Sequence, residues 1–182
     1  SILDILKEKV KEGVDVRVIY DDAGCMFKLP YGYDKKLESM GIKCCVFNPL
    51  KPVLSIRINN RDHRKIAIID GHTGFTGGIN LADEYINEYE KFGHWKDTAI
   101  MVKGEAAWSM TVMFLAMWDY LKGIDEDFNK FRPKLPLSNE ICRDGYIQPF
   151  ADSPLDDEPV GETVYLNLIN KATKSIYITT PY

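Results

Sequence analysis

The first fifty residues alternate twice between a helical and an extended pattern of apolar side chains. Apolar residues recur at helical spacing between residues 3 and 10, and this pattern ends at Gly13. Valines at every second position from 14 to 18 then predict a strand. The same order follows in a second short helix, Gly41 and a strand over residues 42–47. Helix, glycine and strand repeated in this way are typical of βαβ units, so the sequence predicts an α/β fold with a mostly parallel or mixed sheet flanked by helices.

The middle of the chain adds a hairpin and a long helix. Residues 61–70 predict a strand, because they carry β-branched isoleucines and end at an Asp-Gly turn. Residues 75–78 would return as the partner strand of a hairpin. Large apolar residues recur at helical spacing from 105 to 121, which predicts a helix that packs in the core.

Beyond this helix the pattern becomes irregular. Five prolines interrupt residues 133–159, and acidic side chains gather around Asp157. We interpret this segment as a connection between two parts of a protein. One more helix is predicted around residues 164–169, and one more strand over residues 175–180.

Composition restricts the class of protein. The chain has 182 residues, of which 45% are apolar and 27% charged, as in an ordinary globular α/β domain. Its net charge of −4 disfavours a general nucleic-acid binder, so nucleic acid is not an expected partner. The apolar stretches are far shorter than the ~20 residues of a membrane span. The four cysteines lack the paired spacing of a metal site, and we expect no metal and no other cofactor.

The predicted strand over residues 61–70 carries the candidate chemistry. Positions i and i+2 of a strand share a face, so His63 and Lys65 are expected to point the same way. In a regular strand Asp70 would face the opposite side. The segment then offers a nucleophile or base, a fixed cation, and a carboxylate that supports them without direct contact.

The residues after the turn complete a candidate phosphate site. Gly77 and Gly78 would let the backbone approach an anion closely, and Asn80 can donate its side-chain amide to a phosphoryl oxygen. Residues 57–65 carry a local excess of three positive charges in an acidic chain. An edge strand with solvated cations and a glycine turn would explain His63 and Lys65 alone, but not their combination with the glycine pair and Asn80.

This arrangement of His63, Lys65 and Asp70 followed by Gly77, Gly78 and Asn80 resembles the HKD motif of the phospholipase D superfamily. The surrounding sequence is similar to one branch of it, the bacterial cardiolipin synthases. Further segments that resemble this branch are residues 59–65, 70–71, 74–80, 82–85, 95–98, 117–118 and 178–182.

Members of the family carry two HKD motifs, one in each lobe, whereas this chain has one. His72 is not followed by lysine two positions later. His94 is followed by Lys96, but Met101 stands where the motif would have its aspartate. The resemblance implies a first catalytic lobe over residues 1–132 that lacks its opening strand, an interlobe connection over 133–160, and the start of the second lobe over 161–182. The predicted strand over 175–180 would then pair with the sheet of the first lobe, in the same chain or across a dimer.

The resemblance also implies a reaction. His63 would attack phosphorus and form a phosphohistidine, while Lys65 and Asn80 hold the phosphoryl oxygens and the histidine of the second lobe protonates the leaving group. Two phosphatidylglycerol molecules would yield cardiolipin and glycerol. By similarity, Asp97 would orient His63, and Glu84 and Tyr85 would line the site. The parent protein would act at the cytoplasmic face of the cell membrane, and the fragment itself would be soluble.

Two other interpretations remain open at the level of sequence. A single-motif phosphodiesterase or nuclease could build one site from two chains in a homodimer. Alternatively, the lobe could bind anions without turnover. A lipid substrate predicts an apolar groove for acyl chains, whereas a nuclease predicts a basic track. With half of the site on this chain, the fragment alone is expected to be inactive or nearly so.

Overall fold

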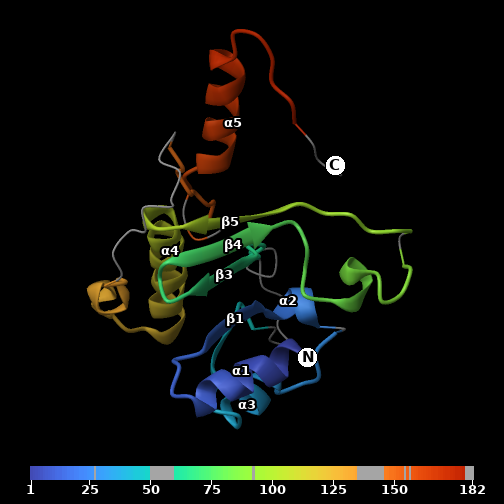
Figure 1. Ribbon diagram of the computed structural model, residues 1–182, viewed down its shortest axis with the longest axis vertical. Coiled ribbons are helices and arrows are strands. Elements are labelled where there is room, and N and C mark those ends of the chain that lie inside the picture. Colours follow the sequence, from blue (N-terminus) through green and yellow to red (C-terminus); the bar gives the residue numbers. More distant parts are fainter. Residues whose placement is uncertain are drawn as a thin grey trace.

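A computed structural model describes the chain over residues 1–26, 28–49, 60–91, 93–134, 146–153, 155 and 157–178 (Figure 1). Two small sheets make up the described fold, and one long helix packs against both of them. The α/β class is confirmed, with the parallel and antiparallel pairings in separate sheets of the described residues.

The first sheet comes from the repeated helix–glycine–strand pattern. Helix α1 (Ile2–Lys11) leads to strand β1 (Arg17–Asp21), and helix α3 (Tyr33–Glu38) leads to strand β2 (Lys43–Phe47). Both glycines end their helices in the left-handed region, with φ of 88° at Gly13 and 80° at Gly41, where a side chain would be strained. The two strands pair in parallel, as predicted. Leu37, Ile42 and Cys44 are buried between this sheet and its helices.

The first strand begins later than its valines suggest. The sequence predicts a strand over residues 14–18, whereas β1 runs from Arg17 to Asp21. The backbone N–H of Val14 donates to the carbonyl of Lys9 at 3.0 Å, so this residue still belongs to the closing turn of α1. Pairing starts only where Arg17 faces Lys43. The alternation of apolar residues predicted a strand correctly, but the position of the partner strand β2 determines at which residue the pairing begins.

The second sheet is an antiparallel meander beneath the candidate site. Strands β3 (Ile66–Ile69) and β4 (Thr73–Gly77) form the predicted hairpin, and β5 (Ala99–Lys103) pairs with β4. Helix α4 (Glu105–Lys122) lies on one face, where Val102, Ala107 and Met110 form a buried cluster. A Cβ atom at Gly74 would come within 2.8 Å of the Met110 sulfur, so the absence of a side chain permits this contact.

The opposite face of this sheet is open among the described residues. Ile69, Phe75 and Met101 are 54%, 38% and 55% exposed, and they alternate with the residues that face α4.

Helix α4 also fixes the first sheet. The Lys122 ammonium donates to the Cys44 carbonyl in β2 at 3.1 Å. From β1, the Arg17 guanidinium lies 5.1 Å from the Trp118 ring and 4.8 Å from the Phe131 ring, and it pairs with Glu126. Such cation–π contacts contribute roughly 0.5–2 kcal/mol each. The first sheet is therefore held to this helix by polar as well as apolar contacts.

Shorter elements complete the fold: α2 (Asp22–Cys25), the 3₁₀ turns η2 (Asp83–Ile86) and η3 (Phe128–Phe131), and α5 (Val160–Lys171). Helix α5 confirms the helix predicted around residues 164–169, and it projects away from the two sheets (Figure 1). None of the helices in the described residues combines the length and the apolar character needed to cross a membrane.

The end of the chain differs from the prediction. Residues 175–178 were expected to begin a strand that pairs with the sheet of the first lobe, in the same chain or across a dimer. Within the chain they are exposed and belong to neither sheet, and pairing across a dimer stays a prediction. Residues 179 and 180 lie outside the described residues. Apolar alternation alone does not make a strand, because the backbone hydrogen bonds need a partner. The division at 132 and 160 stays a prediction; the described residues of the intervening segment contain no helix or strand before α5 begins.

Candidate active site

Three segments of the candidate site meet at one end of the antiparallel sheet. His63 and Lys65 precede β3, Gly77 and Gly78 end and follow β4, and Asp97 precedes β5. Ile66 pairs with Thr76, and Gly77 pairs with Ala99. Since neighbouring strands run in opposite directions, the start of β3, the end of β4 and the start of β5 are adjacent. The hairpin register therefore gathers residues that lie up to 34 positions apart in the sequence.

Residues 61–65 are held by side chains and not by a strand ladder. The predicted strand over 61–70 is reduced to Ile66–Ile69. The Asp21 carboxylate, at the end of β1, accepts hydrogen bonds from the Arg61 Nε at 2.9 Å and from the backbone N–H of Asp62 at 2.9 Å. The same carboxylate accepts the N–H of Gly24 at 2.8 Å and caps α2. A carboxylate that binds backbone N–H groups in this way replaces the ladder that β-branched residues suggested.

Asp62 and Arg64 form a second local pair. The Arg64 side chain donates to both carboxylate oxygens of Asp62, at 2.8 and 2.7 Å, and its backbone N–H adds a bond of 3.1 Å. Burial opposes ionisation of Asp62, but the hydrogen bonds from Arg64 outweigh it and lower the pKa of the carboxyl.

The local excess of cations is therefore largely neutralised. Arg61 is paired with Asp21 and Arg64 with Asp62, while Arg57 lies outside the described residues. In the part of the chain that the structure describes, Lys65 has no carboxylate within ion-pair distance. The local count of charged residues did not reveal that Asp21, 40 positions earlier, neutralises the charge of Arg61.

The His63 and Lys65 side chains are in contact, which confirms that they point the same way. The Lys65 ammonium donates to the His63 carbonyl at 2.7 Å and lies 3.3 Å from Nδ1 of the His63 ring. Lys65 is half-buried, and burial lowers the pKa of its ammonium, with a further lowering by the charge of Arg61. The side chain of His63 is exposed.

This contact suits one of the two neutral tautomers of His63. An ammonium group has only donors, so a protonated Lys65 makes Nδ1 the acceptor and leaves the ring proton on Nε2. The opposite tautomer, with the proton on Nδ1, would require Lys65 to leave Nδ1.

The glycine pair lies against the start of β5. A Cβ atom at Gly77 would come within 2.9 Å of the Ala99 Cβ, and one at Gly78 within 2.8 Å of the Asp97 carboxylate. Both positions thus need glycine for the close approach of the chain itself. A role of these glycines in phosphate binding stays a prediction, although the group that meets Gly78 here is also an anion.

The Asp97 carboxylate makes its hydrogen bonds with residues close to it in the sequence. Its carboxylate accepts the indole N–H of Trp95 at 3.2 Å and the backbone N–H of Thr98 at 2.7 Å. No hydrogen bond joins it to His63 in the described structure. The role of Asp97 as the partner that orients His63 stays a prediction, and it requires the tautomer change described above.

Asn80 follows β4 at the same end of the sheet. Its Nδ2 donates to the Tyr85 hydroxyl at 3.1 Å, and the Tyr85 ring packs edge-to-face on Trp95 with ring centres 4.9 Å apart. Tyr85 therefore contacts a residue of the motif, as the resemblance implied. A side-chain amide carries two N–H donors, so Asn80 retains one for a ligand.

Asp70 lies at the other end of β3. It occupies the hairpin turn with φ of 53°, and β3 spans four residues, so Asp70 lies roughly 13 Å along the strand from the end that carries Lys65. A catalytic role for Asp70 stays a prediction, and in this geometry it could act only through the turn and not by contact.

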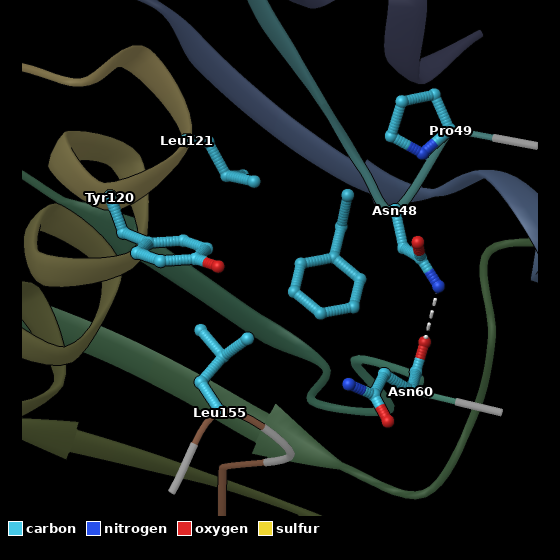
Figure 2. A pocket seen from close by; sticks show the side chains of 7 residues that line it. Asn48, Pro49, Asn60, Tyr120, Leu121 and Leu155 are labelled. Carbon is cyan, nitrogen blue, oxygen red and sulfur yellow. Dashed lines mark hydrogen bonds between the residues drawn. The ribbon is translucent and has the colours of Figure 1, made fainter. Parts of the chain in front are cut away.

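A cavity with both polar and apolar lining includes Asn60, three residues before His63. Its volume is about 370 Å³, and its lining includes Phe47, Leu121, Leu155 and Asn60. Figure 2 shows Tyr120 and Leu121 of α4 on one side and Asn48 and Asn60 on the other, joined by a hydrogen bond of 3.0 Å from the Asn48 amide to the Asn60 carbonyl. Asn60 is three residues from His63, which limits their Cα separation to about 11 Å.

Comparison with known proteins decides the family. The family model described as "Cardiolipin synthase, PLD-like domain" matches residues 1–118. The chain belongs to this family. The described residues contain no group of three His, Cys, Asp or Glu side chains that could hold a metal ion.

Curated relatives extend this result. An uncharacterized protein of Streptococcus mutans is 51% identical over 183 residues, covering 100% of this chain and 39% of the relative. A cardiolipin synthase of Alkalihalophilus pseudofirmus is 39% identical, covering 100% of this chain and 36% of its own length. Cardiolipin synthase 2 of Bacillus anthracis is 40% identical, covering 100% of this chain and 35% of its own length. The chain thus spans little more than a third of these relatives.

Two residues of the site region were missed by sequence reasoning. Asp21 holds the start of the motif, and Lys28 pairs with Glu84 at 2.7 Å. Neither lies in a recognisable motif, and both act on partners 40 or more positions away. The nearest signal for Asp21 was its position directly after an apolar strand, where parallel strands present their carboxyl ends.

We expect Asp21→Ala to lower the free energy of unfolding by about 2–3 kcal/mol, since it removes a helix cap and charge-assisted hydrogen bonds to Arg61 and Asp62. Urea unfolding of the variant and of the unmodified chain measures this difference in the free energy of unfolding. Asp125→Ala, at an exposed position, is the matched control and should change stability by no more than about 0.5 kcal/mol. Equal effects of the two substitutions would contradict the role assigned to Asp21.

We also expect neutral His63 to carry its proton on Nε2, because Lys65 occupies Nδ1. Long-range ¹H–¹⁵N NMR spectra distinguish the two tautomers. The exposed His94 serves as an internal control, and Lys65→Met should reduce the Nε2-protonated fraction at His63 alone. A predominant Nδ1-protonated ring at His63 in the unmodified chain would show that the Lys65 contact does not persist in solution.

Proposed function

We propose that this chain supplies the first catalytic lobe of a phosphatidyltransferase that converts two phosphatidylglycerol molecules into cardiolipin and glycerol. The observation that carries the proposal is the contact of Lys65 with His63 at the sheet end that also presents Asn80 and Asp97. Family membership supports the substrate class, since several relatives are named cardiolipin synthases.

The proposed reaction has two steps. In the first, Nε2 of His63 attacks phosphorus, and the bond from phosphorus to the glycerol oxygen breaks. The leaving oxygen takes a proton from a histidine of the second lobe, and the phosphatidyl group remains on His63. In the second, the free hydroxyl of another phosphatidylglycerol attacks phosphorus and returns its proton to that histidine, which releases cardiolipin and restores His63.

Lys65 would have two successive partners in this scheme. Before substrate binds, its ammonium contacts the carbonyl and Nδ1 of His63. A phosphoryl oxygen is a stronger acceptor for an ammonium than either of these neutral groups, so the substrate would draw Lys65 away. The ring would then exchange protons with solvent, so that Nε2 loses its proton and Nδ1 gains one. The Nδ1–H would donate a hydrogen bond to a carboxylate, for which Asp97 is the candidate. Asn80 would donate its remaining N–H to the same phosphoryl group.

Two observations favour a lipid over a nucleic acid. Arg61 and Arg64 are already paired with Asp21 and Asp62, which removes them from any basic track. The cavity beside Asn60 is lined mainly by apolar side chains and suits an acyl chain (Figure 2). The remaining partners are a second HKD lobe and the cytoplasmic face of the membrane, and the scheme uses no metal or other cofactor.

Lys65→Met should weaken the binding of inorganic phosphate at least about tenfold, because a charge-assisted hydrogen bond is lost. The fold should persist, since burial of the ammonium is unfavourable and no ion pair is broken. Phosphate titration followed by ¹⁵N chemical shifts of Gly77 and Gly78 measures the affinity. Lys103→Met, at the opposite end of β5, is the matched control. Equal phosphate affinity in all three proteins would refute the role of Lys65.

A monomeric sample of the chain should turn over phosphatidylglycerol at least ~100-fold more slowly than a two-motif relative, because half of the acid–base pair is missing. The assay measures cardiolipin in mixed micelles, alongside hydrolysis of a generic phosphodiester. Restored cardiolipin synthesis on addition of a second lobe supports the proposal. Concentration-dependent cleavage of the generic diester would instead favour a homodimeric phosphodiesterase, and phosphate binding without any turnover would favour the anion-binding lobe.

A further inference from the structure

Glu84 is a buried carboxylate that the proposed chemistry does not use. It lies in the 3₁₀ turn η2 and is 5% exposed. Its Oε1 accepts from the Lys28 ammonium at 2.7 Å, and its Oε2 accepts from the Tyr89 hydroxyl at 3.1 Å. The Lys91 ammonium lies 3.7 Å away. A carboxylate removed from water is costly unless it is paired and hydrogen-bonded, and this one has both kinds of partner.

The Lys28 contact ties two distant segments together. Lys28 follows α2, where its backbone N–H donates to the Cys25 carbonyl at 2.8 Å, whereas Glu84 follows the motif residues of β4. The hydrogen bond from Lys28 is the largest cause that lowers the pKa of Glu84, to about 2, so the carboxylate is ionised at neutral pH. The turn η2 is therefore fixed against the β1–α2 region by a permanent charge pair.

The next residue along the chain transmits this fixed position to the site. Tyr85 directs its hydroxyl to Nδ2 of Asn80 and packs its ring on Trp95, which in turn donates to Asp97. The backbone of Trp95 is held on both sides by the Asn87 side chain, at 2.9 and 2.7 Å. Trp95, on which the Tyr85 ring packs, is thus held by hydrogen bonds of its own.

We propose that Glu84 and Lys28 are positioning residues that hold the Tyr85 hydroxyl on Asn80, so that the Asn80 amide is oriented toward a phosphoryl oxygen before the substrate binds. With one N–H on Tyr85, the other has a fixed direction, and no reorganisation is needed on binding. This inference rests on the proposed function, because it assigns Asn80 to the phosphoryl group.

The experiment compares Glu84→Gln, Lys28→Met and Tyr85→Phe, the last of which removes the hydroxyl but keeps the ring on Trp95. Glu88→Gln, an exposed carboxylate four residues on, and Tyr31→Phe, a fully exposed hydroxyl, are the matched controls. Two quantities are measured by NMR: the side-chain amide resonances of Asn80, and the dissociation constant for inorganic phosphate.

We expect each of the three substitutions to shift the Asn80 amide resonances and to weaken phosphate binding about fivefold, the equivalent of one neutral hydrogen bond. The double variant of Lys28→Met and Tyr85→Phe should be no weaker than either single variant, because both remove the same orientation of Asn80. If Glu84 only stabilised the turn, Glu84→Gln would lower the unfolding midpoint, and the losses of phosphate affinity in the Lys28→Met and Tyr85→Phe variants would not be non-additive.

Unchanged Asn80 resonances in Tyr85→Phe, or additive losses of affinity in the double variant, would overturn the inference. Asn80→Ala separates this result from the proposed function: if that substitution weakens phosphate binding while the positioning variants do not, the proposed function stands and the inference fails. If Asn80→Ala has no effect on phosphate, the proposed function loses its assignment of Asn80. The Asn80 resonances then decide the positioning contact by themselves.

Discussion

The carboxylate of Asp21 is the group through which the first sheet holds the catalytic motif. It ends β1, caps α2, and binds both the Arg61 side chain and the backbone N–H of Asp62. Each bond alone is modest, but a single carboxylate satisfies all of them, and its side chain is only 9% exposed. Without it, residues 61–65 would have neither a strand ladder nor another anchor on the first sheet among the described contacts. The position of His63 and Lys65 therefore depends on a residue that the candidate motif does not include.

The second sheet contributes the other half of the geometry through its register. Because β3, β4 and β5 run alternately, the three segments that carry Lys65, Asn80 and Asp97 emerge at the same end. Because Gly77 and Gly78 have no side chains, β5 and the Asp97 carboxylate can lie close to the backbone at these two positions. Helix α4 packs on both sheets and keeps the Asp21 anchor and the hairpin in a fixed relation. The geometry at this end of the sheet thus arises from backbone pairing, from helix α4 and from the buried Asp21 contacts.

Local patterns in the sequence were sufficient to predict the helices α1, α3, α4 and α5, the hairpin of β3 and β4, and the common direction of His63 and Lys65, but not the strand β5. Each of these depends on residues within a few positions of one another. The strand over 61–70 was too long because Asp21, forty residues earlier, offers the backbone a competing acceptor. The strand over 175–180 failed among the described residues because alternation does not supply a partner. Pairing between distant side chains, such as Lys28 with Glu84, leaves no trace in a single sequence, since either residue alone is an ordinary surface charge.

The contact between Lys65 and His63 also determines how the resting histidine responds to other reagents. Where the ammonium donates to Nδ1 and the ring is neutral, Nε2 carries the proton and neither nitrogen offers a free electron pair. An exposed imidazole is ordinarily open to alkylating agents and to transition-metal ions, both of which need such a pair. His63 is exposed, so its reactivity toward both would depend on the fraction of time that the lysine spends on Nδ1. Under the proposed function, the substrate anion and the histidine would compete for a single ammonium group before any bond to phosphorus forms.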